Sequence, residues 1–311
     1  MTSMALSKTG AVSRIAAVIG LGSMGMGMAL SLKRAGLDVL GADISKDAVA
    51  RFVEAGGRAV TDLAEDVRHA DIVVSVVVNA AQTEGVLFGP AGIAETMRPG
   101  AVFVSSATMD PAIARRLAAQ LEAKGVHYLD APISGGAARA AKGELTIMAS
   151  GTPAAFAVAR PALDAMATKV YELGDSAGFG AAFKMINQLL AGVHIAAACE
   201  AITLAAKQGL DLAKVYEVIT ASAGNSWMFE NRIPHVLAGD YTPLSAVDIF
   251  VKDLGIIQDM ARSERYPVPL SAAALQMYLA ASGAGMGRDD DSSLARIYAQ
   301  LSGATLPEKA E

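Results

Sequence analysis

The first half of the chain alternates between two hydrophobic patterns. Short apolar runs rich in Val and Ile predict strands at 15–19, 38–42, 72–78, 102–105, 127–130, 145–150 and 170–172. Between them, apolar residues recur every three or four positions and predict helices at 24–35, 46–55, 91–97, 111–124 and 153–166. Apolar strands that alternate with helices are typical of a mainly parallel sheet covered on both faces, so the predicted fold class is α/β.

The pattern changes at the small-residue segment 174–180, after which no further strand is predicted. A long helical stretch at 181–208 is followed by periodic stretches at 212–222, 245–264, 270–282 and 292–301. The acidic segment 288–291 is expected to be a solvated loop with a helix cap. We therefore expect a disordered N-terminus at 1–13, a sheet domain at 14–177 and an all-helical domain at 178–311.

Composition narrows the function classes. With 53% hydrophobic residues, 18% charged residues and a formal net charge of −5, the chain shows no electrostatic footprint for nucleic acid. Its single cysteine, Cys199, lies in an apolar helical pattern and suits a buried, inert thiol in a reducing cytosol. The most apolar helical stretch, 191–206, is shorter than the ~20 residues of a membrane span. The four histidines show no ligand spacing, so neither a metal nor a membrane partner is expected, and the predicted compartment is the cytoplasm.

A glycine motif connects the first two predicted strands. Gly20 follows the first strand, Gly22 and Gly25 open the next helix, and Asp43 ends the second strand. In that setting Gly20 permits a sharp turn, Gly22 lets a pyrophosphate approach the backbone and Gly25 lets the helix pack against the strand. A carboxylate at Asp43 accepts hydrogen bonds from adenosine ribose hydroxyls and repels a 2′-phosphate. The 14–43 segment therefore predicts a Rossmann-type domain that binds NAD rather than NADP.

The start of the long helix carries a polar cluster. Lys184, Asn187 and Gln188 stand at i, i+3 and i+4 and share one face among apolar neighbours. A buried ammonium needs a partner, so this face is a candidate active site. Spacing alone equally allows a surface lysine with two amides beside it.

Three further segments have both a functional and an ordinary interpretation. The turn Ser134-Gly135-Gly136 follows a predicted strand and offers a hydroxyl and exposed N–H groups to a carboxylate, or it is simply a flexible turn. Thr108 approaches a nicotinamide or caps the next helix. The pair Lys252–Asp253 is by itself typical of a surface ion pair.

Taken in order, these motifs resemble the β-hydroxyacid dehydrogenase family, which includes 3-hydroxyisobutyrate, tartronate semialdehyde and L-threonate dehydrogenases. The similarity covers about 14–301. Four motifs carry it: Gly20-Leu-Gly-Ser-Met-Gly25, Asp130-Ala-Pro-Ile-Ser-Gly-Gly136, Gly180-Ala-Ala-Phe-Lys184-Met-Ile-Asn187-Gln188 and Phe250-Val-Lys252-Asp253-Leu254.

The resemblance implies a role for each matching residue. Lys184 would be the catalytic acid/base, and Asn187 would help to hold the substrate. Ser134, Gly135 and Gly136 would receive the substrate carboxylate. The residues that would bind NAD are Gly20, Leu21, Gly22, Met24, Gly25, Asp43, Val78, Asn79, Thr108 and Lys252. Where the family often has Ser-Ser-Thr, this chain has Ser106-Ala107-Thr108. This difference removes one serine hydroxyl and makes Thr108 the preferred candidate for the contact.

Two segments, 135–146 and 225–232, are most similar to the L-threonate dehydrogenase branch of the family. The second is polar as well as aromatic, and we interpret its donors as contacts for a polyhydroxylated acid. The expected activity is NAD-dependent oxidation of a small hydroxy acid, L-threonate first. The alternatives are tartronate semialdehyde or 3-hydroxyisobutyrate as substrate, or a non-enzymatic NAD-binding scaffold or sensor. The helical domain, rich in Ala, Leu and Ile, predicts a homodimer or homotetramer.

Overall fold

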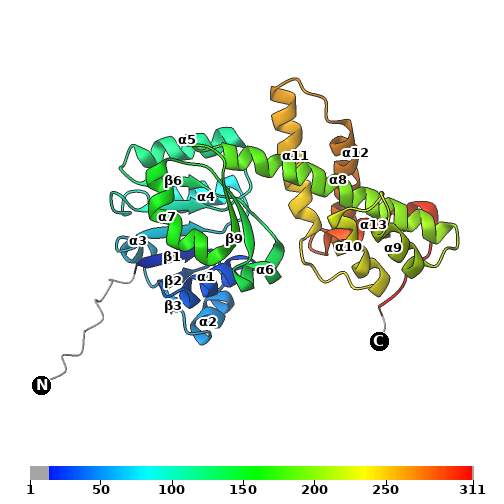
Figure 1. Ribbon diagram of the computed structural model, residues 1–311, viewed down its shortest axis with the longest axis horizontal. Helices are drawn as coiled ribbons and strands as arrows, with labels where there is room; N and C mark the ends of the chain where they lie inside the picture. The colour runs from blue at the N-terminus through cyan, green and yellow to red at the C-terminus, as the bar shows by residue number, and fades with distance from the viewer. Residues whose placement is uncertain (1–13, 310–311) are drawn as a thin grey trace, which may run out of the picture. The chain divides into compact units, whose positions relative to one another are not determined.

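The computed structural model describes residues 14–309, which form two compact units (Figure 1). The first unit contains residues 14–107 and 111–180, and the second contains residues 108–110 and 181–309. The predicted disordered N-terminus, 1–13, lies outside the described residues.

The first unit is built on a six-stranded parallel sheet with the order β3-β2-β1-β4-β5-β6. Ile15 pairs with Asp38 and Ala16 pairs with Ile72, so strands β1, β2 and β4 end at the same edge. The strands are β1 (Ile15–Ile19), β2 (Asp38–Ala42), β3 (Arg58–Ala59), β4 (Ile72–Ser75), β5 (Val102–Ser105) and β6 (His127–Asp130). The inner strands β4 and β5 are buried throughout, as expected for a parallel sheet covered on both faces.

A second, smaller sheet belongs to the same unit and accounts for two strands predicted from the sequence. Its order is β7-β8-β9, with β7 antiparallel to β8 and β8 parallel to β9. Its strands are β7 (Ile133–Ser134), β8 (Leu145–Ala149) and β9 (Ala167–Glu172). The helices of the unit are α1 (Gly25–Arg34), α2 (Lys46–Glu54), α3 (Leu63–Val67), α4 (Ala80–Phe88), α5 (Pro111–Glu122), α6 (Gly136–Lys142) and α7 (Pro153–Met166).

One predicted helix of this unit is wrong. Residues 91–97 form turns, and the helix lies earlier, at Ala80–Phe88. Gly89 and Gly92 interrupt the chain there, and it folds back so that the N–H of Ile93 donates to the carbonyl of Val86. A Cβ at Gly92 would lie 2.5 Å from the carbonyl oxygen of Leu87, so this turn requires a glycine at position 92.

The second unit is all helical. Its elements are α8 (Phe179–Lys207), which begins in the first unit, α9 (Leu212–Thr220), α10 (Trp227–Ala238), α11 (Val247–Ser263), α12 (Pro269–Ala281), the short turns η1 (Ser282–Met286) and η2 (Asp291–Ser293), and α13 (Leu294–Ser302). Its core packs the middle of α8 against α10, α11 and α12, with Ile195, Ile233, Leu254 and Tyr278 fully buried. Together the two units confirm the predicted fold class, a Rossmann-type parallel sheet followed by a helical region.

Helix α8, Phe179–Lys207, has nearly the predicted bounds of 181–208, but its apolar part is longer than the predicted stretch 191–206. By length and composition it qualifies as a membrane span, a test that core helices of soluble proteins also pass. Its residues Met185, Ile195 and Cys199 are completely buried in the core of the second unit. This packing places one face of α8 in the core of the second unit.

Candidate active site

The glycine loop between β1 and α1 has the geometry that the sequence predicted. Gly20 has a φ of +96°, and a Cβ there would lie 2.5 Å from the carbonyl oxygen of Val76. A Cβ at Gly25 would lie 1.8 Å from the carbonyl oxygen of Gly20, so only glycine allows the helix to start this close to the strand. At Gly22, by contrast, a Cβ would meet no atom of the described chain within 4 Å.

Two observations fit this loop to a pyrophosphate. The backbone at Gly22 borders open space, and no described side chain caps the first turn of α1, whose N-cap residue is Met24. The free N–H groups and the helix dipole both favour an anion at this position. The residues present therefore fit the diphosphate of NAD.

Asp43 makes two backbone contacts that the sequence did not reveal. Its Oδ2 accepts a hydrogen bond from the N–H of Leu21 at 2.6 Å, and its Oδ1 accepts one from the N–H of Ser45 at 2.7 Å. The carboxylate therefore holds the glycine loop against the end of β2. Each carboxylate oxygen has a further lone pair, so the predicted contacts to ribose hydroxyls are compatible with these bonds.

Val78 and Asn79, predicted to contact the cofactor, form the start of helix α4. The Oδ1 of Asn79 accepts from the N–H of Gln82 at 2.9 Å, and the Oε1 of Gln82 accepts from the N–H of Val78 at 2.8 Å. This arrangement is a variant of the capping box in which Gln82 accepts from the residue before the N-cap Asn79. The spacing Asn79-x-x-Gln82 was visible in the sequence and is the signal by which α4 could have been predicted.

The predicted carboxylate cradle lies in the first unit at the end of β7. Ser134 is the last residue of that strand, and Gly135 and Gly136 follow with φ values of +134° and +78°. Such backbone conformations favour glycine, so this turn depends on both residues. A Cβ at Gly136 would again meet no described atom within 4 Å.

Asp130, which belongs to the same motif, has a structural role. It is 1% exposed, and its Oδ2 accepts from the N–H of Gly178 at 3.0 Å. The hydroxyl of Ser150 also lies 3.4 Å from that oxygen and accepts from the N–H of Gly180 at 2.9 Å. Together these side chains satisfy backbone N–H groups at the start of α8.

Lys184 lies on α8 in the second unit and is 7% exposed. Burial lowers the pKa of its ammonium to about 8, because a charged amine is poorly solvated there. The charge of Asp253 opposes this shift, and the charge of Lys252 adds to it. A lysine of this kind exchanges a proton near neutral pH, as a general acid or base must.

Asp253 contacts two of the polar residues of the second unit. It is 1% exposed; its Oδ2 accepts from the Nε2 of Gln188 at 2.5 Å, and its Oδ1 lies 2.6 Å from the Nζ of Lys252. The ordinary interpretation of Lys252–Asp253 as a surface pair is therefore wrong. The ammonium of Lys252 also lies 3.5 Å from the carbonyl oxygen of Thr108.

The structure thus brings the predicted residues together in two groups, one in each unit. The glycine loop, Asp43, Val78 and Asn79 follow the carboxyl ends of parallel strands in the first unit. Ser134–Gly136 lie at its small sheet. Lys184, Asn187, Thr108 and Lys252 belong to the second unit. Gln188 and Asp253 were quoted from the sequence but given no role. The expectation that a buried Lys184 needs a partner is the signal by which Asp253, whose charge favours the ammonium, could have been found.

The polar segment 225–232 does not offer its charged groups to a ligand in the way the sequence suggested. Arg232 is 6% exposed and is ion-paired with Asp291, which is fully buried. The side chain of Asn231 contacts the same guanidinium, and Asn225 donates to Glu230 at 2.5 Å. The acidic segment 288–291 is likewise not simply a solvated loop, because Asp291 is 0% exposed and faces the helical core. The sequence alone does not show this burial.

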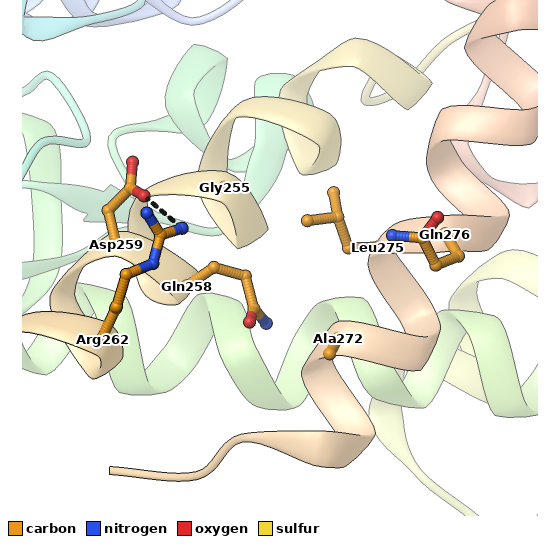
Figure 2. Close-up of a pocket in the computed structure, with 7 residues that line it drawn as sticks. All are labelled: Gly255, Gln258, Asp259, Arg262, Ala272, Leu275 and Gln276. Atoms are coloured by element: carbon orange, nitrogen blue, oxygen red, sulfur yellow. Dashed lines mark ion pairs between the residues drawn. The ribbon is translucent and has the colours of Figure 1, made fainter. Parts of the chain in front are cut away.

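One shallow pocket of about 290 Å³ lies elsewhere in the second unit, between α11 and α12 (Figure 2). It is lined by Gly255, Gln258, Asp259, Arg262, Ala272, Leu275 and Gln276, none of which was predicted to act in the reaction. Among the described residues no group of three or more His, Cys, Asp or Glu side chains is arranged to hold a metal. Cys199 is completely buried, as predicted, and burial raises the pKa of its thiol.

Comparisons with known proteins cover both units. Residues 15–174 match the NAD binding domain of 6-phosphogluconate dehydrogenase, and residues 178–298 match the NAD-binding domain of NADP-dependent 3-hydroxyisobutyrate dehydrogenase. An L-threonate dehydrogenase of Cupriavidus necator is 54% identical, and the match covers 96% of this chain and 100% of that protein. One of Escherichia coli is 50% identical, with 96% and 98% covered. The crystal structure of a 3-hydroxyisobutyrate dehydrogenase from Salmonella typhimurium is 51% identical with a TM-score of 0.87, covering 92% of this chain and 100% of that one.

Proposed function

This chain belongs to the 3-hydroxyisobutyrate dehydrogenase family, the NAD-dependent hydroxyacid dehydrogenases, and we propose that its substrate is L-threonate, which it oxidises to the 2-oxo acid. The family membership makes it an oxidoreductase that acts on a CH–OH group with a nicotinamide cofactor. The observation that carries the choice of substrate is the identity of 50–54% to curated L-threonate dehydrogenases over nearly the whole chain.

Lys184 performs the proton transfer in this proposal. In its neutral form the Nζ accepts the proton of the C2 hydroxyl as the C–H bond breaks. Nicotinamide, when bound, supplies the acceptor for the hydride. The protonated Lys184 then stabilises residual negative charge on the carbonyl oxygen, and its proton passes to water. The products are the 2-oxo acid, the reduced cofactor and one proton.

The other predicted residues bind and orient the substrate and the cofactor. Ser134, Gly135 and Gly136 receive the substrate carboxylate with a hydroxyl and backbone N–H groups, which compensate for its lost hydration. Asn187 contacts the substrate one helical turn after Lys184. Lys252 and Thr108 contact the nicotinamide side, and the glycine loop binds the pyrophosphate. Holding the reacting carbon near the cofactor raises the rate of hydride transfer, because the reactants are already close together and oriented for reaction.

A panel of hydroxy acids tests the choice of substrate. Initial rates with NAD⁺ should give the highest kcat/KM for L-threonate, while tartronate semialdehyde, measured in the reductive direction, and 3-hydroxyisobutyrate should be poorer substrates. The second candidate, 3-hydroxyisobutyrate, is favoured by the name of the Salmonella typhimurium structure, which is 51% identical. A higher kcat/KM for 3-hydroxyisobutyrate than for L-threonate would replace the first proposal with the second.

We further propose that the enzyme is a homodimer or homotetramer and works in the cytoplasm. Phe183, Ile186 and Leu190 follow one face of α8 at spacings of three and four residues, and they are 53%, 57% and 48% exposed. A continuous apolar stripe of this kind on a soluble enzyme is suited to burial against a second copy of the chain.

A further inference from the structure

Five residues of the second unit form a continuous polar chain. The Nδ2 of Asn187 donates to the Oε1 of Gln188 at 3.0 Å, and the Nε2 of Gln188 donates to the Oδ2 of Asp253 at 2.5 Å. The Oδ1 of Asp253 lies 2.6 Å from the Nζ of Lys252, which lies 3.5 Å from the carbonyl oxygen of Thr108. The chain thus begins at the proposed substrate residue Asn187 and ends at the proposed cofactor residues.

The chemistry of Asp253 determines the direction of every hydrogen bond in this chain. An ionised carboxylate only accepts, and an ammonium only donates. Gln188 must therefore turn its NH₂ group toward Asp253, and its carbonyl oxygen faces Asn187. That oxygen accepts only from a donor, so Asn187 must turn its own NH₂ group toward Gln188. Reversing either amide would place two acceptors or two donors in contact in a buried site.

We propose that Gln188 and Asp253 are positioning residues that make Asn187 present its carbonyl oxygen, Oδ1, to a hydroxyl group of the substrate other than the one that is oxidised. The inference rests on the proposed function, since it assigns Asn187 to the substrate. The inference adds the direction of the hydrogen bond between the substrate and Asn187. A substrate hydroxyl donates to Oδ1, whereas a carboxylate or a methyl group does not.

This direction of the hydrogen bond selects polyhydroxylated acids. In the described part of the chain, the bond to Gln188 is the one side-chain hydrogen bond that Asn187 makes, so a ligand that displaces water from Oδ1 must supply a donor to it. A substrate with a methylene or methyl group at that place leaves the oxygen desolvated and unpaired. Sites built to hydrogen-bond a hydroxyl reject analogues that lack it far more strongly than apolar pockets reject an added one.

The test compares L-threonate with two analogues, one lacking the C3 hydroxyl and one lacking the C4 hydroxyl. In the wild-type enzyme we expect kcat/KM for L-threonate to exceed that for at least one analogue. Gln188→Leu removes both amide contacts, so Asn187 rotates freely, and this discrimination should fall about tenfold. The effect should appear mainly in KM for L-threonate, with kcat for the favoured analogue nearly unchanged.

A second variant provides a readout that a loss of packing would not produce. In Gln188→Glu, a protonated carboxyl donates its O–H to Asp253 and still accepts from Asn187, which restores the chain. The neighbouring carboxylate raises the pKa of such a glutamate, and ionisation then drives it away from Asp253. Discrimination should therefore be retained at low pH, where the glutamate is protonated, and lost once the pH exceeds the pKa of the glutamate. The ratio of kcat/KM for two substrates does not depend on the protonation state of Lys184, because the oxidation of both substrates requires its neutral form.

Gln258→Leu is the matched control. Gln258 lies on α11 in the same unit (Figure 2). Its Nε2 donates to the hydroxyl of Ser271 at 3.3 Å. This variant should leave the discrimination unchanged, and thermal unfolding together with NAD binding establishes that each variant is folded. Unchanged discrimination against both analogues in folded Gln188→Leu would overturn the inference. Lack of activity of the wild-type enzyme on L-threonate would instead overturn the proposed function, so the two failures are distinct.

Discussion

Arg232 and Asp291 form a two-pronged ion pair that is almost completely withdrawn from water. The guanidinium of Arg232 contacts both carboxylate oxygens of Asp291, with 3.1 Å between Nη2 and Oδ2, and the two side chains are 8% and 0% exposed. The pair joins α10 to the turn before α13, and Asp290, also fully buried, caps that turn through the N–H of Ser292. It is therefore part of the framework of the helical unit.

Breaking this pair should destabilise the helical unit. Arg232→Met leaves a buried carboxylate without its partner, and we expect a loss of about 3–5 kcal/mol in the free energy of unfolding. The double variant Arg232→Met/Asp291→Leu removes both charges and should recover most of that loss. Urea unfolding curves measure both. A single variant that unfolds like the wild type would show that the pair contributes little.

Replacing Lys184 should abolish turnover without affecting the fold. Lys184→Ala removes the proton acceptor, and we expect kcat to fall by about 10²–10⁴-fold. NAD binding, followed by fluorescence, should stay near the wild-type value. Lys184→Arg preserves the positive charge but does not lose a proton near neutral pH, so it should be similarly inactive. Full activity in either variant would disprove the catalytic role.

The pH dependence of oxidation should follow the neutral form of Lys184. Its pKa of about 8 predicts that kcat/KM rises with pH to a plateau above that value. Asp253 favours the ammonium, so Asp253→Asn should move this limb to lower pH. Lys252 disfavours it, so Lys252→Met should move the limb to higher pH. Shifts in the same direction for both variants would contradict the electrostatic account.

Asp43 should determine the preference for NAD over NADP. Asp43→Asn removes the negative charge that repels a 2′-phosphate and keeps an oxygen that accepts from the N–H of Leu21. We expect the ratio of kcat/KM for NAD to that for NADP to fall about tenfold. Lys46→Ala, at the start of α2, is a charge-changing control that should change the ratio less. Equal use of both cofactors by the wild type would show that Asp43 does not face the ribose.

A charge in the exposed stripe of α8 should weaken self-association. Ile186 is 57% exposed, and Ile186→Lys places an ammonium within the stripe. Sedimentation should show a dimer or tetramer for the wild type and a larger fraction of the 31.8 kDa chain for the variant. Lys214→Glu, on an exposed face of α9, is a charge-changing control. A wild type that sediments as a single chain at micromolar concentration would refute the oligomer itself.

Local patterns were sufficient for the elements whose stability is local. The β-branched runs at Ile15–Ile19, Asp38–Ala42 and Val102–Ser105 have the predicted bounds, and so does the helix at Pro153–Met166. The glycine loop was also predictable, because the spacing Gly20-x-Gly22-x-x-Gly25 between a strand and a helix is itself a local motif. Short elements such as α3 and α6, and the displaced helix α4, were missed because their hydrophobic repeats are too brief to show a period.

The sequence by itself determined the two-part architecture, the dinucleotide loop and the face of α8 that carries Lys184, since spacing along one strand or helix sets all three. Only the tertiary structure decided which charges are buried together. Lys252–Asp253 and the acidic segment 288–291 look solvated in the sequence, yet Asp253 and Asp291 are 1% and 0% exposed. Their partners Gln188 and Arg232 are 65 and 59 residues away in the chain. Pairing over such distances depends on how the helices pack, which no local pattern encodes.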